Sequence, residues 1–177
     1  MKLYLLRHAE AVSRDSEDIP DDYRVLSTCG REVVKKVGRW CVDQQIQVEQ
    51  IVSSPLIRAV QTAEILSGII HPAKDVEIAL PLMAGGAVGQ VMRFLPLHQH
   101  LKSLLLIGHE PAIGMTVSAL LDLEKKVSFS PGAMCCCTYH GTDRMPQASF
   151  EWMLQPLSDA KTKTVTLKTI SSIEMLL

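Results

Sequence analysis

The sequence lacks a hydrophobic run long enough to cross a membrane, and it lacks an excess of either charge. Its 177 residues include 18 lysines and arginines against 19 aspartates and glutamates, which gives a formal net charge of -1. A membrane-spanning helix needs about 20 consecutive apolar residues, and nucleic acid or an anionic membrane surface attracts proteins with a positive field. The composition therefore argues against a nucleic-acid or membrane partner. Any affinity for anions must come from a local cluster of cations.

A secretory signal is also missing, and cysteines are few. The apolar run at residues 3–6 ends at Arg7, far short of the about 7–15 apolar residues of a signal-peptide core. The five cysteines are an odd number, and three of them are consecutive at residues 135–137. Because adjacent side chains of a strand point to opposite faces, this run suits neither a zinc site nor a disulfide framework. We expect buried thiols and a reducing, cytoplasmic location.

Short apolar runs alternate with amphipathic stretches along the chain. Such a pattern is typical of an α/β fold, in which helices cover a sheet. Ser27 or Thr28 begins the first predicted helix after a polar loop over residues 13–25, and Pro55 suits the first turn of a second helix that runs to about residue 70. Helices are expected after each of the first four strands. The expected strands span residues 3–6, 50–53, 76–79, 103–107, 133–139, 148–154 and 164–167.

These elements predict one domain over residues 1–177. We expect a three-layer α/β sandwich with a mostly parallel central sheet, flanked by helices, and an antiparallel edge. No repeat, linker or low-complexity segment divides the chain. For residues 159–177 the pattern leaves both a strand and a helix open.

Cationic side chains follow three of the predicted parallel strands. Arg7 and His8 end the first strand, Arg58 lies near the end of the second, and His109 follows the fourth. Ligands of open α/β sheets bind beyond the carboxyl ends of the strands. Taken singly, such residues are more often solvated or hydrogen-bonded, but guanidinium groups match phosphate oxygens and imidazole is a nucleophile or base near neutral pH. Together they favour phosphoryl transfer.

Three ordered motifs surround these cations, at residues 5–11 (LLRHAEA), 53–63 (SSPLIRAVQTA) and 108–111 (GHEP). In this order and spacing they resemble the signature of the histidine phosphatase superfamily, which includes the phosphoglycerate mutases. The short length, together with residues 24–27 and Gly30, is similar to the SixA-type branch of phosphohistidine phosphatases. The resemblance extends from residue 1 to about residue 157.

The resemblance implies a phosphoglycerate mutase-like fold and a covalent phosphohistidine intermediate on His8. His8 would be the nucleophile, and Arg7, Arg58 and His109 would be the other catalytic residues and would bind the phosphate. The implied enzyme is a metal-independent hydrolase with no cofactor. Its partner would be a phosphohistidine-bearing signalling or phosphotransfer protein, and inorganic phosphate would be its product.

Two positions depart from the family pattern. Ala9 replaces the usual glycine after the histidine, which is a mild change. The glutamate acid that many members carry near a Gly-rich turn is absent, because Leu82 or Met83 stands at the matching position. An alkyl ester gains about 10²–10⁴-fold from a general acid, whereas a phosphorylated imidazole leaves with far less help. The missing acid therefore favours phosphohistidine over phosphosugar substrates.

Other polar residues lie close to the motifs. Arg24 and Glu10 are candidates for the fringe of the pocket. Four carboxylates are candidates to replace the missing acid, although a surface or capping role is commoner for each of them. They are Glu10, Asp21, Asp22 and Glu110.

Two other functions stay open at this point. A phosphatase for small phosphate esters would carry an enclosing lid and a carboxylate acid, and neither is clear in the sequence. A non-catalytic phosphate- or phosphoprotein-binding module would have lost the nucleophile, yet His8 is present. A mutase is less favoured, because it needs a closed site that keeps water from the intermediate.

Overall fold

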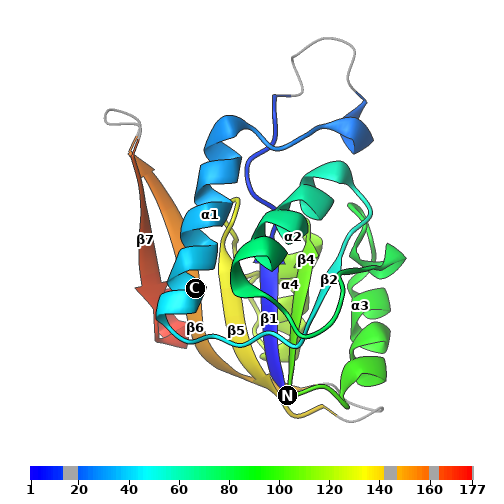
Figure 1. The fold of residues 1–177 in the computed structure, drawn as a ribbon. Helices are drawn as coiled ribbons and strands as arrows, with labels where there is room; N and C mark the ends of the chain where they lie inside the picture. Colours follow the sequence, from blue (N-terminus) through cyan, green and yellow to red (C-terminus); the bar gives the residue numbers. More distant parts are fainter. Residues whose placement is uncertain (14–19, 142–146, 160–163, 177) are drawn as a thin grey trace.

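The central layer of the fold is a seven-stranded sheet in the order β3-β2-β4-β1-β5-β6-β7 (Figure 1). It is seen in a computed structural model that describes residues 1–13, 20–141, 147–159 and 164–176. Strands β1 to β4 are parallel, and β5 to β7 are antiparallel to their neighbours. The strands are β1 Lys2–Arg7, β2 Gln50–Ser53, β3 Glu77–Ile78, β4 Ser103–Gly108, β5 Met134–Tyr139, β6 Ala148–Asp159 and β7 Thr164–Ile170.

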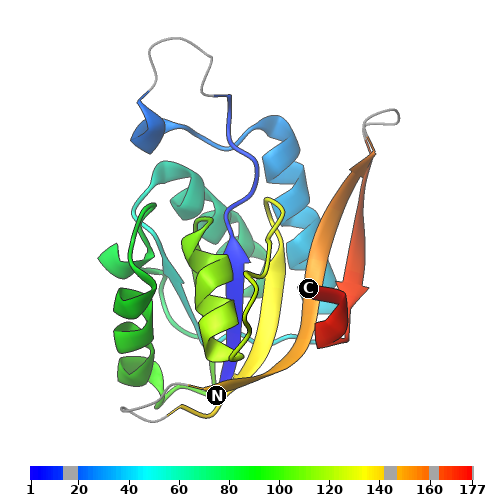
Figure 2. The same cartoon turned by 180° about the vertical axis from the view of Figure 1, so that it is seen from behind.

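Helices cover both faces of the sheet, which confirms the predicted three-layer α/β sandwich. Helices α1 (Thr28–Asp43) and α2 (Ile57–Ile70) pack together on one face (Figure 1). Helices α3 (Val88–Phe94) and α4 (Ala112–Leu120) cover the other face (Figure 2). Because both faces are covered, β1 and β4 are almost entirely apolar and buried. Within the described part of the chain, none of the helices has the length and apolar character to cross a membrane.

Local signals in the sequence explain where the first two helices begin. The Ser27 hydroxyl accepts a hydrogen bond from the Gly30 N–H at 2.9 Å and caps α1, as predicted. Helix α2 begins at Ile57, just after Pro55, and buries Ala59 among other residues of its inner face. The predicted polar loop 13–25 contains a short 3-10 helix, Asp21–Tyr23, while residues 14–19 of that loop lie outside the described residues.

The run of three cysteines contributes to both cores of the molecule. Cys135 and Cys137 pack in the core under α3 and α4, and Cys136 packs in the core under α1 and α2. All three are buried free thiols, as the alternation of a strand predicts. They serve as small apolar residues between β1 and β6.

The C-terminal region adds both a strand and a helical turn. Strand β6 is longer than predicted and lies inside the sheet, paired with β5 and β7. Strand β7 forms the edge, and its residues alternate between exposed and half-buried. A 3-10 helix, Ile173–Leu176, follows. Of the predicted segment 159–177, residues 160–163 and 177 lie outside the described residues.

Candidate active site

The carboxyl ends of β1, β2 and β4 meet at one edge of the sheet and bring distant residues together. Arg7 of β1 pairs in register with Gly108 of β4, so His8 and His109 both follow directly at the same level. The His8 N–H donates to the Gly108 carbonyl at 3.0 Å, and the Ser54 N–H donates to the Ile107 carbonyl at 2.9 Å. Backbone pairing therefore fixes the start of each loop.

A cavity of about 280 Å³ opens at this edge. Its walls include Arg7, His8, Arg58, His109, Arg24 and Glu10. These are the four residues predicted to be catalytic and the two fringe candidates, and the structure brings all six together. Three guanidinium groups thus surround two imidazole rings whose centroids are 4.8 Å apart.

His8 is buried, and its tautomer follows from its contacts. Its Nδ1 lies 2.6 Å from the Ala9 carbonyl oxygen. A carbonyl oxygen only accepts hydrogen bonds, so Nδ1 carries the proton and Nε2 carries the lone pair. The Arg58 Nε–H donates to that Nε2 at 3.3 Å. Burial is the main cause that lowers the pKa of His8 to about 4. The Ala9 contact, second in size, opposes the shift, and the nearby guanidinium charges add to it. His8 is therefore neutral near pH 7.

Arg58 is almost fully buried, and Asp21 of the preceding loop accepts two of its hydrogen bonds. Its Nη1–H donates to the Asp21 carbonyl at 2.6 Å, and its Nη2–H donates to Asp21 Oδ2 at 3.0 Å. The other carboxylate oxygen of Asp21 accepts from Arg24 Nε at 3.0 Å and from Arg24 Nη2 at 2.8 Å. Asp21 thus connects two cations of the cavity. The sequence pattern gave Asp21 only as a candidate acid or surface residue, although its i, i+3 spacing to Arg24 was a signal for the ion pair.

Arg7 is anchored from the opposite side of the cavity. Its Nη1–H donates to the Phe129 carbonyl at 2.7 Å, while its Nε is buried and has no hydrogen-bond partner among the described residues. Burial lowers the pKa of Arg7, and the Glu110 carboxylate opposes that shift. Arginine keeps its charge under such a shift because its ordinary pKa is very high. Arg7 therefore offers a fixed positive charge and an unused donor.

His109 is also buried, and it contacts a serine that follows β2. Its Nε2 lies 2.8 Å from Ser54 Oγ, and its Nδ1 has no hydrogen-bond partner in the described part of the chain. Burial is the main cause that lowers the pKa of His109 to about 3, with further effects from His8, Arg58 and Arg7 that outweigh the opposing Asp21 charge. The sequence pattern placed Ser54 at this edge but did not indicate its contact with His109.

The cavity contains carboxylates, but each already accepts a hydrogen bond. Glu10 accepts from the Ser27 hydroxyl at 2.8 Å, and Glu110 accepts from Lys126 Nζ at 2.9 Å. Near the position where related enzymes are expected to carry an acid, Leu82 is buried and Ala84 forms the wall. Asp22 is exposed and is not part of the wall. Among the described residues, no group of three or more potential ligands could hold a metal ion.

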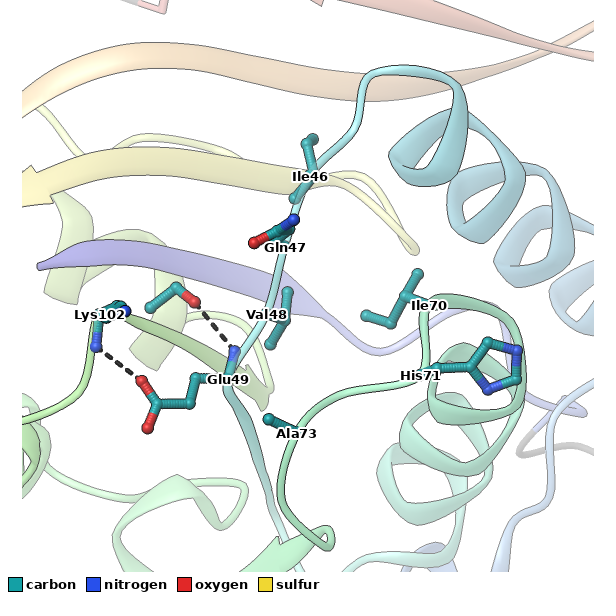
Figure 3. Close-up of a pocket in the computed structure, with 9 residues that line it drawn as sticks. Ile46, Gln47, Val48, Glu49, Ile70, His71, Ala73 and Lys102 are labelled. Atoms are coloured by element: carbon teal, nitrogen blue, oxygen red, sulfur yellow. Dashed lines mark hydrogen bonds between the residues drawn. The ribbon is translucent and has the colours of Figure 1, made fainter.

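A larger hollow, of about 540 Å³, lies at the opposite end of the sheet, where β2 and β4 begin. Figure 3 shows Glu49 and Lys102 on one side of it and His71 on the other. The Glu49 carboxylate accepts from the Lys102 N–H at 2.8 Å, and the Glu49 N–H donates to Ser103 Oγ at 2.9 Å. These contacts cap the start of β4, so the polar groups here have a structural role.

Comparisons with known proteins agree with the motifs around the smaller cavity. A family model described as histidine phosphatase superfamily (branch 1) matches residues 3–80. Phosphohistidine phosphatase SixA of Escherichia coli (strain K12) is 26% identical over 167 residues, which covers 93% of this chain and 100% of that protein. An uncharacterized protein of Picosynechococcus sp. (strain ATCC 27264 / PCC 7002 / PR-6) is 32% identical over 125 residues, which covers 68% of this chain and 73% of that protein.

The fold is similar to that of a solved relative. The structure of the protein histidine phosphatase SixA complexed with tungstate has a TM-score of 0.77 and 26% identity to this chain. The match covers 86% of this chain and 96% of that one. The similarity therefore extends over most of the fold.

Proposed function

We propose, from the premise that the chain belongs to the histidine phosphatase superfamily (branch 1), that it removes phosphate from phosphohistidine by way of a phosphohistidine on its own His8. Family membership, together with the full-length similarity to a phosphohistidine phosphatase, supports a phosphatase. The identity of the nucleophile and of the substrate is our proposal. The observation that supports it best is the neutral His8 ring, whose Nε2 lone pair faces the Arg58 guanidinium in a cavity lined by cations.

In the first step, the His8 Nε2 lone pair attacks phosphorus. A bond forms between Nε2 and phosphorus while the bond to the substrate nitrogen breaks, and its electron pair stays with the leaving imidazole. Arg7 and Arg58 neutralise the charge on the phosphoryl oxygens, which is most of what such a transfer requires. Arg58 Nε–H, which donates to Nε2 in the empty cavity, turns to a phosphoryl oxygen once Nε2 is occupied.

In the second step, water attacks the phosphoryl group on His8. The bond between phosphorus and Nε2 breaks, its electron pair returns to Nε2, and orthophosphate leaves with the oxygen of the water. The Ala9 carbonyl holds the Nδ1 proton throughout, so His8 returns to the tautomer in which it began. The cycle needs no group beyond those of the cavity and water.

A phosphorylated imidazole fits this cavity better than an alkyl phosphate ester. The imidazole that leaves can take a proton on its second nitrogen near neutral pH, so it needs no acid from the enzyme. An alkoxide needs one. Glu10 and Asp21 accept hydrogen bonds from Ser27 and Arg58. Glu110 accepts from Lys126 through Oε2, while its Oε1 is buried without a partner among the described residues. The full-length similarity to SixA supports the same substrate, and tungstate in the related structure is a tetrahedral oxyanion like phosphate.

The test compares two substrate classes with the same purified protein. One is a protein domain that carries phosphohistidine, and the other is a panel of small phosphate esters. We expect rapid release of orthophosphate from the first, its loss in His8→Ala, and no effect of EDTA. Rapid ester hydrolysis with slow phosphohistidine hydrolysis would replace our proposal with a small-ester phosphatase.

A second measurement tests the covalent step. Acid quenching destroys a phosphoramidate, so the reaction is stopped in base and the protein is examined by mass spectrometry for an added phosphoryl group. We expect the group on His8 in the wild-type protein and none in His8→Ala. Turnover of phosphohistidine without such a group would indicate direct attack by water.

A further inference from the structure

Ser54 is a fully buried serine whose hydroxyl has two neighbours. Its Oγ accepts a hydrogen bond from the Leu56 N–H at 3.3 Å and lies 2.8 Å from His109 Nε2. The Leu56 N–H can only donate, so the Ser54 hydroxyl proton is free to point elsewhere. Of these two neighbours, His109 Nε2 is the one that can accept it. Buried hydroxyls are normally satisfied as donors as well as acceptors.

The hydroxyl proton therefore determines which nitrogen of His109 is protonated. If Ser54 donates to Nε2, that nitrogen carries the lone pair, and the single proton of the neutral ring lies on Nδ1. His109 Nδ1 is buried and has no partner among the described residues, yet His109 is part of the cavity wall. A buried N–H without a partner is costly, and an oxyanion bound in the cavity would satisfy it.

We propose that Ser54 is a positioning residue that keeps the His109 proton on Nδ1, where it donates to the phosphoryl group as the group is transferred. The proposal rests on the proposed function, because it assigns His109 its part in phosphoryl transfer. It also explains two features that the proposed mechanism does not otherwise use. One is the buried Ser54 hydroxyl next to His109 Nε2, and the other is His109 Nδ1, which has no partner among the described residues.

The neighbouring residue Ser53 provides a matched control. It is as fully buried as Ser54, but its hydroxyl donates to the Ser54 carbonyl at 3.0 Å and is not part of the cavity wall. Ser53→Ala and Ser54→Ala remove the same atom from adjacent buried positions. Ser54→Thr keeps the hydroxyl and is the conservative variant.

The first readout is the tautomer of His109, measured by long-range ¹H–¹⁵N NMR of the imidazole nitrogens in the ligand-free protein. We expect the proton on Nδ1 in the wild-type protein, in Ser53→Ala and in Ser54→Thr, and a mixture of both tautomers in Ser54→Ala. A wild-type protein with the His109 proton on Nε2 would overturn the proposal, even if no variant folds.

The second readout is the kinetics of phosphohistidine hydrolysis. We expect kcat of Ser54→Ala to fall by about 5–50-fold with KM nearly unchanged. This is less than the about 10²–10³-fold cost of losing an oxyanion donor, because the ring still visits the productive tautomer. Ser54→Thr should restore kcat. An unchanged kcat in Ser54→Ala, or an equal fall in Ser53→Ala, would contradict the proposal.

The two readouts also separate this proposal from the proposed function. A wild-type protein that leaves phosphohistidine intact but has the Nδ1 tautomer would reject the substrate and keep the role of Ser54. In that case the binding of tungstate to the wild-type protein and to Ser54→Ala replaces the kinetics. Weaker binding to the variant would support the role of Ser54, and equal binding would overturn it.

Discussion

The two ends of the sheet both carry a hollow with histidine and charged side chains, but these side chains are used differently. At the end where β2 and β4 begin, the hollow is larger, and Glu49 caps the backbone of Lys102. At the end where the strands finish, the hollow is about half that size. Arg58, His8 and His109 are buried there, while Arg7 and Arg24 are partly exposed. Arg7 Nε and His109 Nδ1 have no partners there among the described residues.

The difference indicates that the proposed phosphate site is distinguished by its unsatisfied donors and not by its volume. Buried cations are costly unless something compensates for their charge. At the carboxyl ends of the strands that compensation is incomplete without a ligand, whereas the polar groups around Glu49 complete one another. The end that carries the proposed site is therefore expected to be less stable locally, and substitutions at the two ends should have different consequences.

The largest expected difference between the two ends concerns their histidines. His8→Asn should lower turnover of phosphohistidine by roughly 10⁴-fold or more, because it removes the nucleophile. His71→Asn, in the larger hollow, should keep wild-type turnover, since asparagine tolerates the left-handed backbone of His71, with its φ of 48°. The measurement is steady-state release of orthophosphate. A His8→Asn protein with more than about 1% of wild-type turnover would remove the nucleophile from our mechanism.

The next effect concerns the arginine that contacts the His8 ring. Arg58→Ala should lower kcat/KM by about 10²–10³-fold, the cost of losing one oxyanion donor. Arg39→Ala, at an exposed position of α1, is the control and should be neutral. Circular dichroism of both variants shows whether the fold is kept, because Arg58 also holds Asp21. An effect below about tenfold would mean that Arg58 anchors the loop and does not stabilise the transferred phosphoryl group.

A third effect is on stability. The pKa values of His8 and His109 lie at about 4 and about 3, below the ordinary histidine value of 6.5. As pH falls below 6.5 the unfolded chain therefore takes up protons before the folded protein does, and the free energy of unfolding decreases. We expect a loss of about 1–2 kcal/mol per histidine between pH 7 and pH 5.

Urea unfolding at several pH values measures this dependence. The double variant His8→Asn/His109→Asn should lose most of the slope between pH 7 and pH 5, whereas the exposed control Arg39→Ala should keep it. The difference in slope between the proteins gives the contribution of the His8 and His109 rings, because the other groups that titrate in this pH range are common to all the proteins. Equal slopes in all three proteins would show that the rings of the smaller cavity take up protons as easily as they do in the unfolded chain.

The sequence predicted the parts of the site that follow from topology. Parallel strands end at one edge, so Arg7, His8, Arg58 and His109 had to approach one another once the strands were assigned. The contacts of Asp21 and Ser54 join residues 37 and 55 positions apart, as Asp21 with Arg58 and Ser54 with His109. Such contacts depend on how loops close over the sheet, and residue types alone do not encode a distance.

The same limit applies to the fold at its far edge. Buried strands such as β1 are visible as continuous apolar runs. Strand β7 is half exposed, and its pattern of threonine, valine and lysine suits a strand without requiring one. Its pairing with β6 makes this segment a strand. The same pairing extends β6 past its predicted end at residue 154 to Asp159.

The smallest expected effect tests the larger hollow directly. The hydrogen bond from the Lys102 N–H is the main cause that holds the pKa of Glu49 below its usual value. Desolvation opposes this shift, and the ion pair with Lys74 adds to it. Glu49→Gln keeps an acceptor for the Lys102 N–H and removes only the charge. An exposed ion pair contributes little, so we expect the Tm to fall by less than about 2 °C and kcat/KM to stay the same. A fall in kcat/KM without a change in Tm would mean that β2 or β4 couples the two ends of the sheet, and the larger hollow would then be part of the function.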